Sequence, residues 1–591
     1  MHPFSLHFII ATILAAGIAS FFCKGWRRRI VAIVIVPTAF YTLFYNFDYC
    51  IINSTSSIVM SYGGAVYVCF LYLFLMSFKT TNVHKVVPQK IYPKIILFFV
   101  LQYVAIVYAA AIPWAIDTFP MSNVEAVLFT VFAGANEGAE EFVFSSIVDG
   151  IVFPSIKFFL FGVLIQVVIT YALTRVDKGL IFALWKIRYF FCPGPFKRCL
   201  LFLQKGLLAF IALYCFVLSL VLPGIVLSAP FRTLFEIPVD SELYRNHYVH
   251  PDSLKLEISK NPKNLIVIMM ESMETNFERY TPEIAKLQNE NTNFAPGGVS
   301  VAGTGWTIAG ITGKLCGIPL NMPMGITEYL GKLPTYLPGA TCMMEILEKM
   351  GYNQVYMQGS SGNFTQKRAF WNVHGNVRVY DVEYFRYIGK IPEDYNVLWG
   401  FEDRKLYNFA KSELDSLWNK NAPFVLYMLT VDTHQPVGYV DAQCAEIFST
   451  IEGKLPRALH CASKQLGDFI DWAKQQPWYE NTVISVMGDH TMPMLSSKAN
   501  VPPSDSLYWT NFIINSAVTT PVRERQYSSL DMFPTLLEAM GFKLEKRSAG
   551  LGRSLYSDSL TMLELYGRRT LDRLLRERSI QYDEYLMGKK K

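Results

Sequence analysis

The stretch Asn264-Leu-Ile-Val-Ile-Met-Met270-Glu271-Ser272 contains six consecutive apolar residues followed directly by polar ones. A continuous apolar run of this length is typical of a strand buried on both faces of a mostly parallel sheet. Three later runs have the same form and are separated by helical stretches, which predicts an α/β layer structure over residues 264–545. These runs are residues 352–357, 424–430 and 482–487.

Polar residues follow each predicted strand at its carboxyl end. Glu271 follows the first strand, Gln358-Gly359 the second, Asp432-Thr433-His434 the third and Gly488-Asp489-His490 the fourth. In open α/β sheets the binding crevice lies outside the carboxyl ends of the strands, so we expect these residues to share one site. A helix cap or a satisfied buried acid is the simpler explanation for any one of them alone.

The mixed oxygen and nitrogen ligands in this set suit a divalent metal. They are Glu271, Asp489 and His490. Asp489 would be desolvated after a buried strand without an evident partner, which favours the metal interpretation.

Residues 301–310 form a Gly-rich segment, Val-Ala-Gly-Thr-Gly-Trp-Thr-Ile-Ala-Gly, whose end has the composition of a helix start. Backbone N–H groups at a helix N-terminus bind phosphate well. A hydroxyl such as that of Thr307 is a weak nucleophile unless a metal or base activates it. Such a segment alone is more often an ordinary tight turn, so it indicates a phosphate site only in combination with the predicted metal ligands.

Together these segments resemble the extracytoplasmic phosphoglycerol transferases of the alkaline phosphatase and sulfatase superfamily. Within it, GTGWTIAG, YMQG and DTHQP are most similar to the branch acting on osmoregulated periplasmic glucans. Lipoteichoic acid synthases and phosphoethanolamine transferases are more distant. The resemblance covers most of residues 262–545 and implies an alkaline phosphatase-like α/β/α sandwich.

The resemblance implies that Thr307 is the nucleophile and also a metal ligand, with Glu271, Asp489 and His490 completing a site for one divalent metal. Mn2+ is the first choice, and Zn2+ or Mg2+ also fit this ligand set. His434 is expected to touch the phosphoryl group and to assist the attacking or leaving oxygen. The Cys/Ser-x-Pro-x-Arg signature of the sulfatase branch is not seen at the nucleophile segment, which disfavours that branch.

The resemblance also implies substrate contacts from Lys367 and Trp306. Lys367 falls where lipoteichoic acid synthases carry an arginine that holds the glycerophosphate. Those synthases have a tryptophan two places earlier, where this chain has Thr365. The departure weakens a lipoteichoic acid function and leaves headgroup recognition open.

The implied reaction has two steps. Thr307 attacks the phosphorus of phosphatidylglycerol and diacylglycerol departs, and then an acceptor hydroxyl, expected on a periplasmic glucan, attacks the glycerophosphoryl-threonine. A phosphoethanolamine transferase acting on lipid A or another surface glycan and a metal-dependent phosphodiesterase remain alternatives. A non-catalytic scaffold is disfavoured, because a scaffold has no need of the catalytic set.

The part of the chain before residue 230 is expected to be a membrane domain. The chain of 591 residues is 51% hydrophobic and only 17% charged, and its apolar residues are concentrated there. Stretches of about 20 apolar residues are long enough to span a bilayer. Six such stretches lie near residues 5–23, 30–48, 57–78, 94–116, 154–174 and 206–228.

Basic residues cluster after the first, third and fifth stretches, which places those loops in the cytoplasm. The even number of spans then puts the N-terminus and everything after the sixth span outside. A cleaved signal peptide is the competing explanation of the first span, but no basic region precedes it. We therefore expect a multi-pass protein of the bacterial inner membrane with its catalytic domain in the periplasm.

The predicted organisation is a transmembrane domain (1–228), a juxtamembrane linker (229–263), the catalytic domain (264–545) and a helical C-terminal tail (546–591). Four of the ten cysteines lie in the outer domain, where thiols tend to oxidise. Four cysteines allow three pairings, of which we expect the local ones, Cys316 with Cys342 and Cys444 with Cys461. The net charge of +6 is too small for a nucleic-acid-binding profile.

Overall fold

The computed structural model describes residues 238–254, 256–257, 263–321, 336–434, 437–492, 508–518 and 523–588, together with Ile13 and a few residues between 148 and 160. By its contacts the chain divides into two units, residues 1–118 with 144–231 and residues 119–143 with 232–591. Of the first unit the structure describes little beyond the π-helix η4 (Val148–Val152).

The predicted membrane spans lie almost entirely outside the described residues. Within the described residues no helix is both long and apolar enough to cross a bilayer. The transmembrane domain and its orientation therefore stay predictions, as do the bounds of the four predicted regions.

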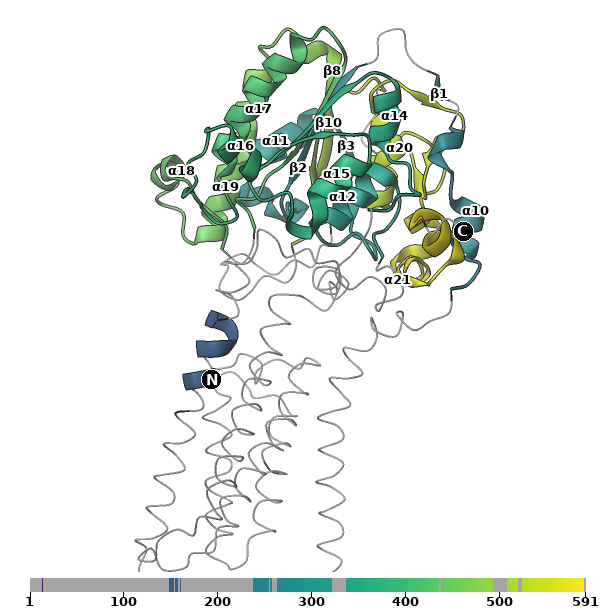
Figure 1. Cartoon of the computed structure of the whole chain (residues 1–591), viewed down its shortest axis with the longest axis horizontal. Coiled ribbons are helices and arrows are strands. Elements are labelled where there is room, and N and C mark those ends of the chain that lie inside the picture. The colour runs from purple at the N-terminus through teal and green to yellow at the C-terminus, as the bar shows by residue number, and fades with distance from the viewer. Residues whose placement is uncertain are drawn as a thin grey trace, which may run out of the picture. The chain divides into compact units, whose positions relative to one another are not determined.

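The second unit is built on an eight-stranded sheet (Figure 1). The five neighbouring strands β8, β2, β7, β5 and β6 are parallel, whereas β10 runs antiparallel to both β8 and β3. The strand order is β11 (Arg523–Glu524), β3 (Thr292–Ala295), β10 (Asn511–Ile514), β8 (Thr482–Gly488), β2 (Asn264–Met270), β7 (Phe424–Leu429), β5 (Asn353–Gln358) and β6 (Arg378–Tyr380).

The four strands predicted from the sequence are confirmed as β2, β5, β7 and β8, each within one residue at either end. They are adjacent in the sheet, and their registers align Met270 with Gly488 and Met269 with Leu429. The carboxyl ends of β2, β7 and β8 therefore lie side by side, and so do the polar residues that follow them.

Alternate residues of β2 enter two different cores, because successive side chains of a strand point to opposite faces. Leu265, Val267 and Met269 pack with one set of helices, and Ile266, Ile268 and Met270 with another. The α/β sandwich is thus confirmed, with a helical layer on each face (Figure 1). The first layer contains α10 (Glu242–His247), α12 (Thr307–Cys316), α14 (Met343–Lys349), α15 (Lys367–Val373), α20 (Met532–Ala539) and α21 (Met562–Arg576); the second contains α11 (Pro282–Glu290), α16 (Val382–Tyr387), α17 (Asp403–Trp418) and α19 (Lys454–Ala473), with α18 (Ala442–Ile447) beside α19.

Short elements complete the unit. The small sheets pair β1 (Leu256–Glu257) with β13 (Lys543–Leu544), β4 (Gly298–Val299) with β12 (Tyr527–Ser528) and β9 (Tyr508–Trp509), and β14 (Ser548–Ala549) with β15 (Gly552–Arg553). The short helices are η5 (Pro251–Ser253), η6 (Thr275–Tyr280), η7 (Phe364–Gln366), η8 (Tyr479–Asn481), η9 (Ser529–Asp531) and η10 (Gln581–Leu586).

Two further features tie the unit together. Both local cysteine pairs are disulfides, and Cys316–Cys342 joins the end of α12 to the N-cap of α14. The C-terminal segment packs into the first core, because Leu571 and Leu575 of α21 are fully buried there. The predicted helical tail is therefore packed into the core of the second unit.

Candidate active site

The structure brings Glu271, Asp489 and His490 together at the carboxyl ends of β2 and β8. Their potential ligand atoms all lie within 4.8 Å of one another. His490 Nε2 is 3.4 Å from Asp489 Oδ2 and 3.8 Å from Glu271 Oε1, and all three residues are buried. Two carboxylates and an imidazole thus converge in one enclosed space.

One oxygen of Asp489 is committed to the backbone, and the other is not. Asp489 Oδ1 accepts hydrogen bonds from the N–H groups of Ser272 and His490, each at 2.8 Å. Ser272 has a φ of 51°, an uncommon conformation for this residue type, and it also donates its hydroxyl to Glu271 Oε1 at 2.6 Å. Asp489 Oδ2 is buried and has no hydrogen-bond partner in the described part of the chain. A cation is the partner that a buried, unpaired carboxylate oxygen requires.

The imidazole of His490 is also oriented in a way that suits metal binding. Its Nδ1 lies 2.8 Å from the carbonyl oxygen of Thr491, and a carbonyl oxygen only accepts, so Nδ1 carries the proton. In the neutral ring Nε2 then presents its lone pair toward the two carboxylates. A second hydrogen bond of this kind is what usually orients a histidine that binds metal.

The electrostatics without a cation are unfavourable. Burial, and then the neighbouring Glu271, raise the pKa of Asp489 to about 6. Burial lowers the pKa of His490, but the charges of Asp489 and Glu271 outweigh it, so that the pKa is raised. A divalent cation would relieve the repulsion between the carboxylates, and the residues therefore fit the metal that the sequence predicts.

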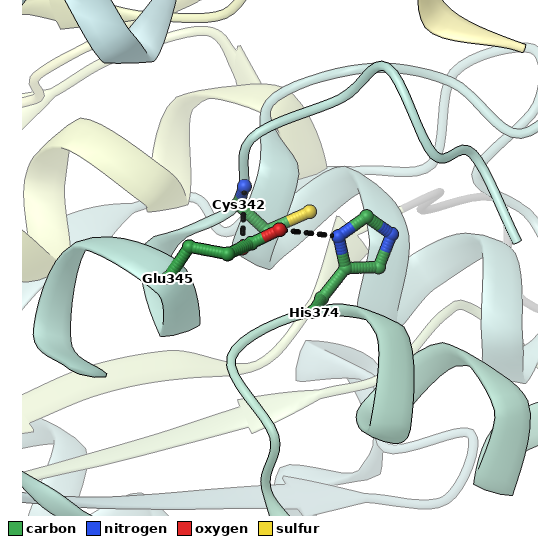
Figure 2. A group of neighbouring side chains, drawn as sticks. All are labelled: Cys342, Glu345 and His374. Atoms are coloured by element: carbon green, nitrogen blue, oxygen red, sulfur yellow. Dashed lines mark hydrogen bonds and ion pairs between the residues drawn. The ribbon is translucent and has the colours of Figure 1, made fainter. Parts of the chain in front are cut away.

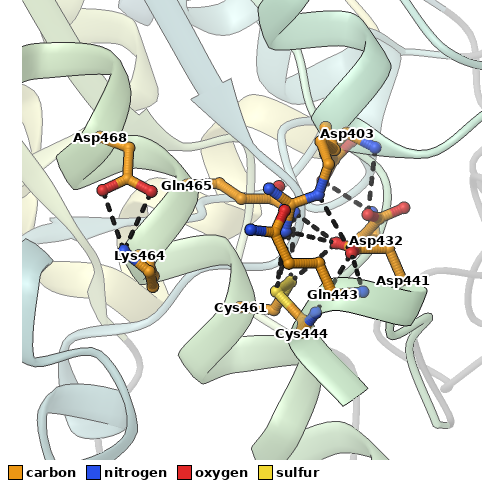
Figure 3. Close-up of a disulfide and its surroundings, with 10 residues drawn as sticks. Asp403, Asp432, Asp441, Gln443, Cys444, Cys461, Lys464, Gln465 and Asp468 are labelled. Atoms are coloured by element: carbon orange, nitrogen blue, oxygen red, sulfur yellow. Dashed lines mark hydrogen bonds and ion pairs between the residues drawn. A yellow bond between two sulfur atoms is a disulfide. The ribbon is translucent and has the colours of Figure 1, made fainter. Parts of the chain in front are cut away.

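Two other groups have metal-like composition, Cys342 with Glu345 and His374, and Asp441 with Cys444 and Cys461 (Figures 2 and 3). Their cysteines form the two disulfides, so they offer no thiolate. In the first group Glu345 accepts from the Cys342 N–H at 2.9 Å and contacts His374 Nδ1 at 2.7 Å (Figure 2). Both groups are structural, which leaves the Glu271 cluster as the metal candidate among the described residues.

The N-terminus of α12 lies against this cluster. The helix begins at Thr307, which is half-buried, and Trp306 is its N-cap. A Cβ on Gly310 would lie 2.2 Å from the carbonyl oxygen of Asp489, so only glycine allows this approach. Residues three apart share a helix face, and Thr307 therefore lies on the face that α12 turns toward Asp489.

Lys314, which sequence reasoning missed, lies on the same helix and is fully buried. Its Nζ donates to the Asp489 carbonyl oxygen at 2.6 Å and to Ser529 Oγ at 3.2 Å, and lies 4.2 Å from the centre of the Trp509 ring. Burial lowers its pKa to about 7. A lone lysine in a short helix carries no sequence signal of such burial.

His434 follows β7 and is connected to the cluster through its neighbour. Thr433 donates its hydroxyl to the backbone oxygen of Glu271 at 2.6 Å. Preceding it, the buried Asp432 accepts from the N–H of Asp403 at 3.0 Å, and Asp403 accepts from the N–H of Asp432 at 3.0 Å. Figure 3 shows these two carboxylates beside the Cys444–Cys461 disulfide. The loop that presents His434 is therefore firmly anchored.

Lys367 is buried at the start of α15. Its Nζ donates to the carbonyl oxygen of Phe364 at 2.9 Å and lies 3.5 Å from Thr365 Oγ1. Thr365 and Gln366 have φ angles of 54° and 57°, which reverse the chain so that this contact forms. Burial lowers the pKa of Lys367 to about 8, and Glu271 is the largest charge opposing that shift. Lys367 thus lies within electrostatic reach of the cluster.

Trp306 is nearly buried, and its indole N–H has no acceptor among the described residues. The Gly-rich segment before it is held from the C-terminal helix, because Asp572 of α21 accepts from the N–H of Ala302 at 2.7 Å. Sequence reasoning missed Asp572, since α21 shows only the pattern of a basic amphipathic helix. The roles of Thr307, His434, Lys367 and Trp306 stay predictions.

The α/β architecture and the converging acid and histidine residues agree with a match of residues 263–542 to the sulfatase family. The chain carries a sulfatase-family domain. The matched residues run from just before β2 to just beyond α20 and include every predicted site residue.

Two curated relatives match part of this chain. Phosphoglycerol transferase I of Xanthomonas campestris pv. campestris is 31% identical over 307 residues, which cover 50% of this chain and 43% of that protein. Phosphoglycerol transferase I of Salmonella typhimurium is 32% identical over 240 residues, which cover 39% of this chain and 31% of that protein. The chain thus matches less than half the length of these relatives. The prediction of an enzyme is confirmed at the level of the domain.

The solved structures to which this chain is similar include a protein of the alkaline phosphatase superfamily from Vibrio parahaemolyticus. It is 23% identical with a TM-score of 0.43, and the match covers 56% of this chain and 78% of that one. The lipoteichoic acid synthase LtaP from Listeria monocytogenes is 20% identical with a TM-score of 0.40, covering 51% and 79%.

Proposed function

We propose that this protein is a membrane-anchored transferase that moves phosphoglycerol from phosphatidylglycerol to a periplasmic glucan and uses Thr307 as nucleophile. The observation that carries the proposal is the buried Glu271–Asp489–His490 cluster against the face of α12 that begins at Thr307. The chain's similarity to two phosphoglycerol transferases supports the choice of the transferred group. The site then faces the periplasm at the inner membrane, where the lipid donor lies.

Each site residue has a separate role in the proposed reaction. Glu271, Asp489, His490 and Thr307 hold one divalent metal, which, when bound, stabilises charge on the transferring phosphoryl group and favours the ionised hydroxyl. The N–H groups at the start of α12 face the phosphate oxygens. Lys367 holds the glycerophosphate through its ammonium group, and Trp306 offers its indole N–H to the substrate.

In the first step the Thr307 oxygen, which has already lost its proton, forms a bond to phosphorus, and the phosphorus–oxygen bond to diacylglycerol breaks. The leaving oxygen takes a proton, and we assign His434 as its donor. In the second step an acceptor hydroxyl gives up its proton and attacks the same phosphorus, and the bond to Thr307 breaks. His434 returns to its starting state because the second proton transfer reverses the first.

The proposal is tested with the full-length protein in detergent, Mn2+ and headgroup-labelled phosphatidylglycerol or phosphatidylethanolamine. We expect diacylglycerol release and protein-bound label from phosphatidylglycerol, both lost in Thr307→Ala and both retained in Thr570→Ala, a control at an exposed threonine of α21. Label only from phosphatidylethanolamine would move the assignment to phosphoethanolamine transfer. Headgroup release by a folded Thr307→Ala protein would defeat the mechanism.

A further inference from the structure

Two aromatic rings from separate loops stack next to His434. Phe364 of η7 and Trp399, from the loop before α17, have ring centres 5.3 Å apart and planes inclined by 27°. The Trp399 ring centre is 5.0 Å from that of His434, with the planes at 60°. All three side chains are half-buried and so retain accessible surface. We call Phe364 and Trp399 the aromatic platform.

The turn that presents Trp399 is fastened to the end of β5. Residues 397 and 400 exchange both backbone hydrogen bonds, at 2.7 and 3.0 Å, and Phe401 donates its N–H to Gly359 at 2.9 Å. A Cβ on Gly400 would lie 2.1 Å from the Gly359 oxygen, and Leu398 has an uncommon φ of 51°. Strain of this kind persists where the surrounding structure enforces it, most often at functional sites.

The platform borders the proposed active site on two sides. His434 follows Thr433, whose hydroxyl bonds to Glu271. Phe364 supplies the carbonyl oxygen that holds Lys367, and the Lys367 ammonium lies 5.0 Å from the centre of the Phe364 ring. A molecule resting on the platform therefore lies beside the groups assigned to the phosphoryl group.

The chemistry around the platform favours a neutral, hydroxyl-rich ligand. The flat face of a sugar ring carries C–H groups that pack on aromatic faces, while its edge needs polar partners. The loop of residues 391–402 contains Glu393, Asp394 and Glu402 and no basic residue. Glu393 and Asp394 are exposed, so they repel anionic lipid headgroups and acidic polysaccharides.

We propose that the aromatic platform binds a neutral sugar ring of the acceptor and thereby positions its hydroxyl beside His434. This inference rests on the proposed function, because it names the acceptor site of the same reaction. Trp399 supplies the second ring of the platform, next to Phe364, from a different loop.

The test measures binding of a neutral glucose oligosaccharide to the full-length protein in detergent by saturation-transfer NMR and calorimetry. Trp399→Ala is expected to weaken binding by at least about tenfold, since buried tryptophan contacts commonly dominate an interface. Trp399→Phe, which keeps a flat ring, is expected to stay within about threefold of wild type. The matched control is Trp418→Ala, at an exposed tryptophan at the end of α17.

Folding is checked by the thermal midpoint and by Mn2+ binding. Equal affinity in Trp399→Ala and Trp418→Ala overturns the proposal, and so does Trp399-dependent binding of anionic vesicles or an acidic oligosaccharide in preference to the neutral one. Saccharide binding that requires Trp399, without diacylglycerol release by wild type, supports the platform and defeats the proposed transfer. Diacylglycerol release by wild type without Trp399-dependent saccharide binding supports the proposed transfer and defeats the platform.

Discussion

Replacing Asp572 by alanine should loosen the segment that leads to Thr307. The carboxylate accepts from the N–H of Ala302 at 2.7 Å and pairs with Arg568 at 3.2 Å. A hydrogen bond to a charged group contributes about 1.5–3 kcal/mol, and the Asp572 side chain is 18% exposed, which favours the lower half of that range. The Arg568 pair is more exposed and adds less than about 1 kcal/mol. We therefore expect the free energy of unfolding to fall by about 2 kcal/mol.

The effect on turnover follows from position. Ala302 precedes Thr307 by five residues in the Gly-rich segment, so a lost anchor shifts the nucleophile. Misplacement by about 1 Å costs on the order of a hundredfold in rate. We expect a ten- to hundredfold slower diacylglycerol release, at an order-of-magnitude level, and a thermal midpoint lower by about 4 °C. Asp572→Asn keeps an acceptor oxygen and should recover part of both losses.

The assay compares the full-length variants in detergent by thermal unfolding and by the rate of diacylglycerol release from phosphatidylglycerol. Glu584→Ala is the matched control, because it removes an exposed carboxylate from η10 in the same C-terminal segment. If Asp572→Ala releases diacylglycerol as fast as Glu584→Ala and unfolds at the same temperature, then α21 does not hold the Gly-rich segment in place.

Three further outcomes are expected. Burial raises the pKa of Asp531 to about 6, so the folded state binds a proton that the unfolded state has already lost. The free energy of unfolding should therefore fall by about 3 kcal/mol as the pH rises from about 4 to 6. Denaturant unfolding should show a weaker dependence of this free energy on pH in Asp531→Asn. Burial lowers the pKa of Lys314 to about 7, so the unfolded state binds more protons and stability should rise from about pH 7 to 10.5 in the chelator-treated protein; Lys314→Met should lose this rise in the same measurement. Mn2+ should raise the thermal midpoint of wild type and not that of Asp489→Asn. The variant keeps the backbone contacts of Oδ1 but lacks the negative charge of the carboxylate. An equal rise in both proteins would show that Asp489 is not a metal ligand.

The sheet and the acid cluster were accessible from sequence for a simple reason. Strands buried on both faces read as unbroken apolar runs, and parallel strands bring their carboxyl ends to one edge. Glu271, Asp489 and His490 stand directly after two such strands, so their convergence required only that β2 and β8 be neighbours.

Other parts of the site depended on contacts that no local pattern records. The position of Lys367 followed from the resemblance, but its burial depends on two left-handed residues, Thr365 and Gln366, that a sequence pattern does not reveal. Trp399 lies in an irregular loop, and only the fastening of residue 400 to the end of β5 places its ring over Phe364.

The sequence by itself determined the α/β class, the four central strands and the acid and histidine set, because apolar periodicity and residue type are local properties. The two disulfide pairings were one of three possibilities until the fold brought the cysteines together. The tertiary structure alone decided that Lys314 supports Asp489, 175 positions away, and that Asp572 holds Ala302, 270 positions away. Such contacts form only when packing of the core brings distant helices to the site, and a lysine or aspartate on a helix looks the same in sequence whether it faces solvent or a backbone group.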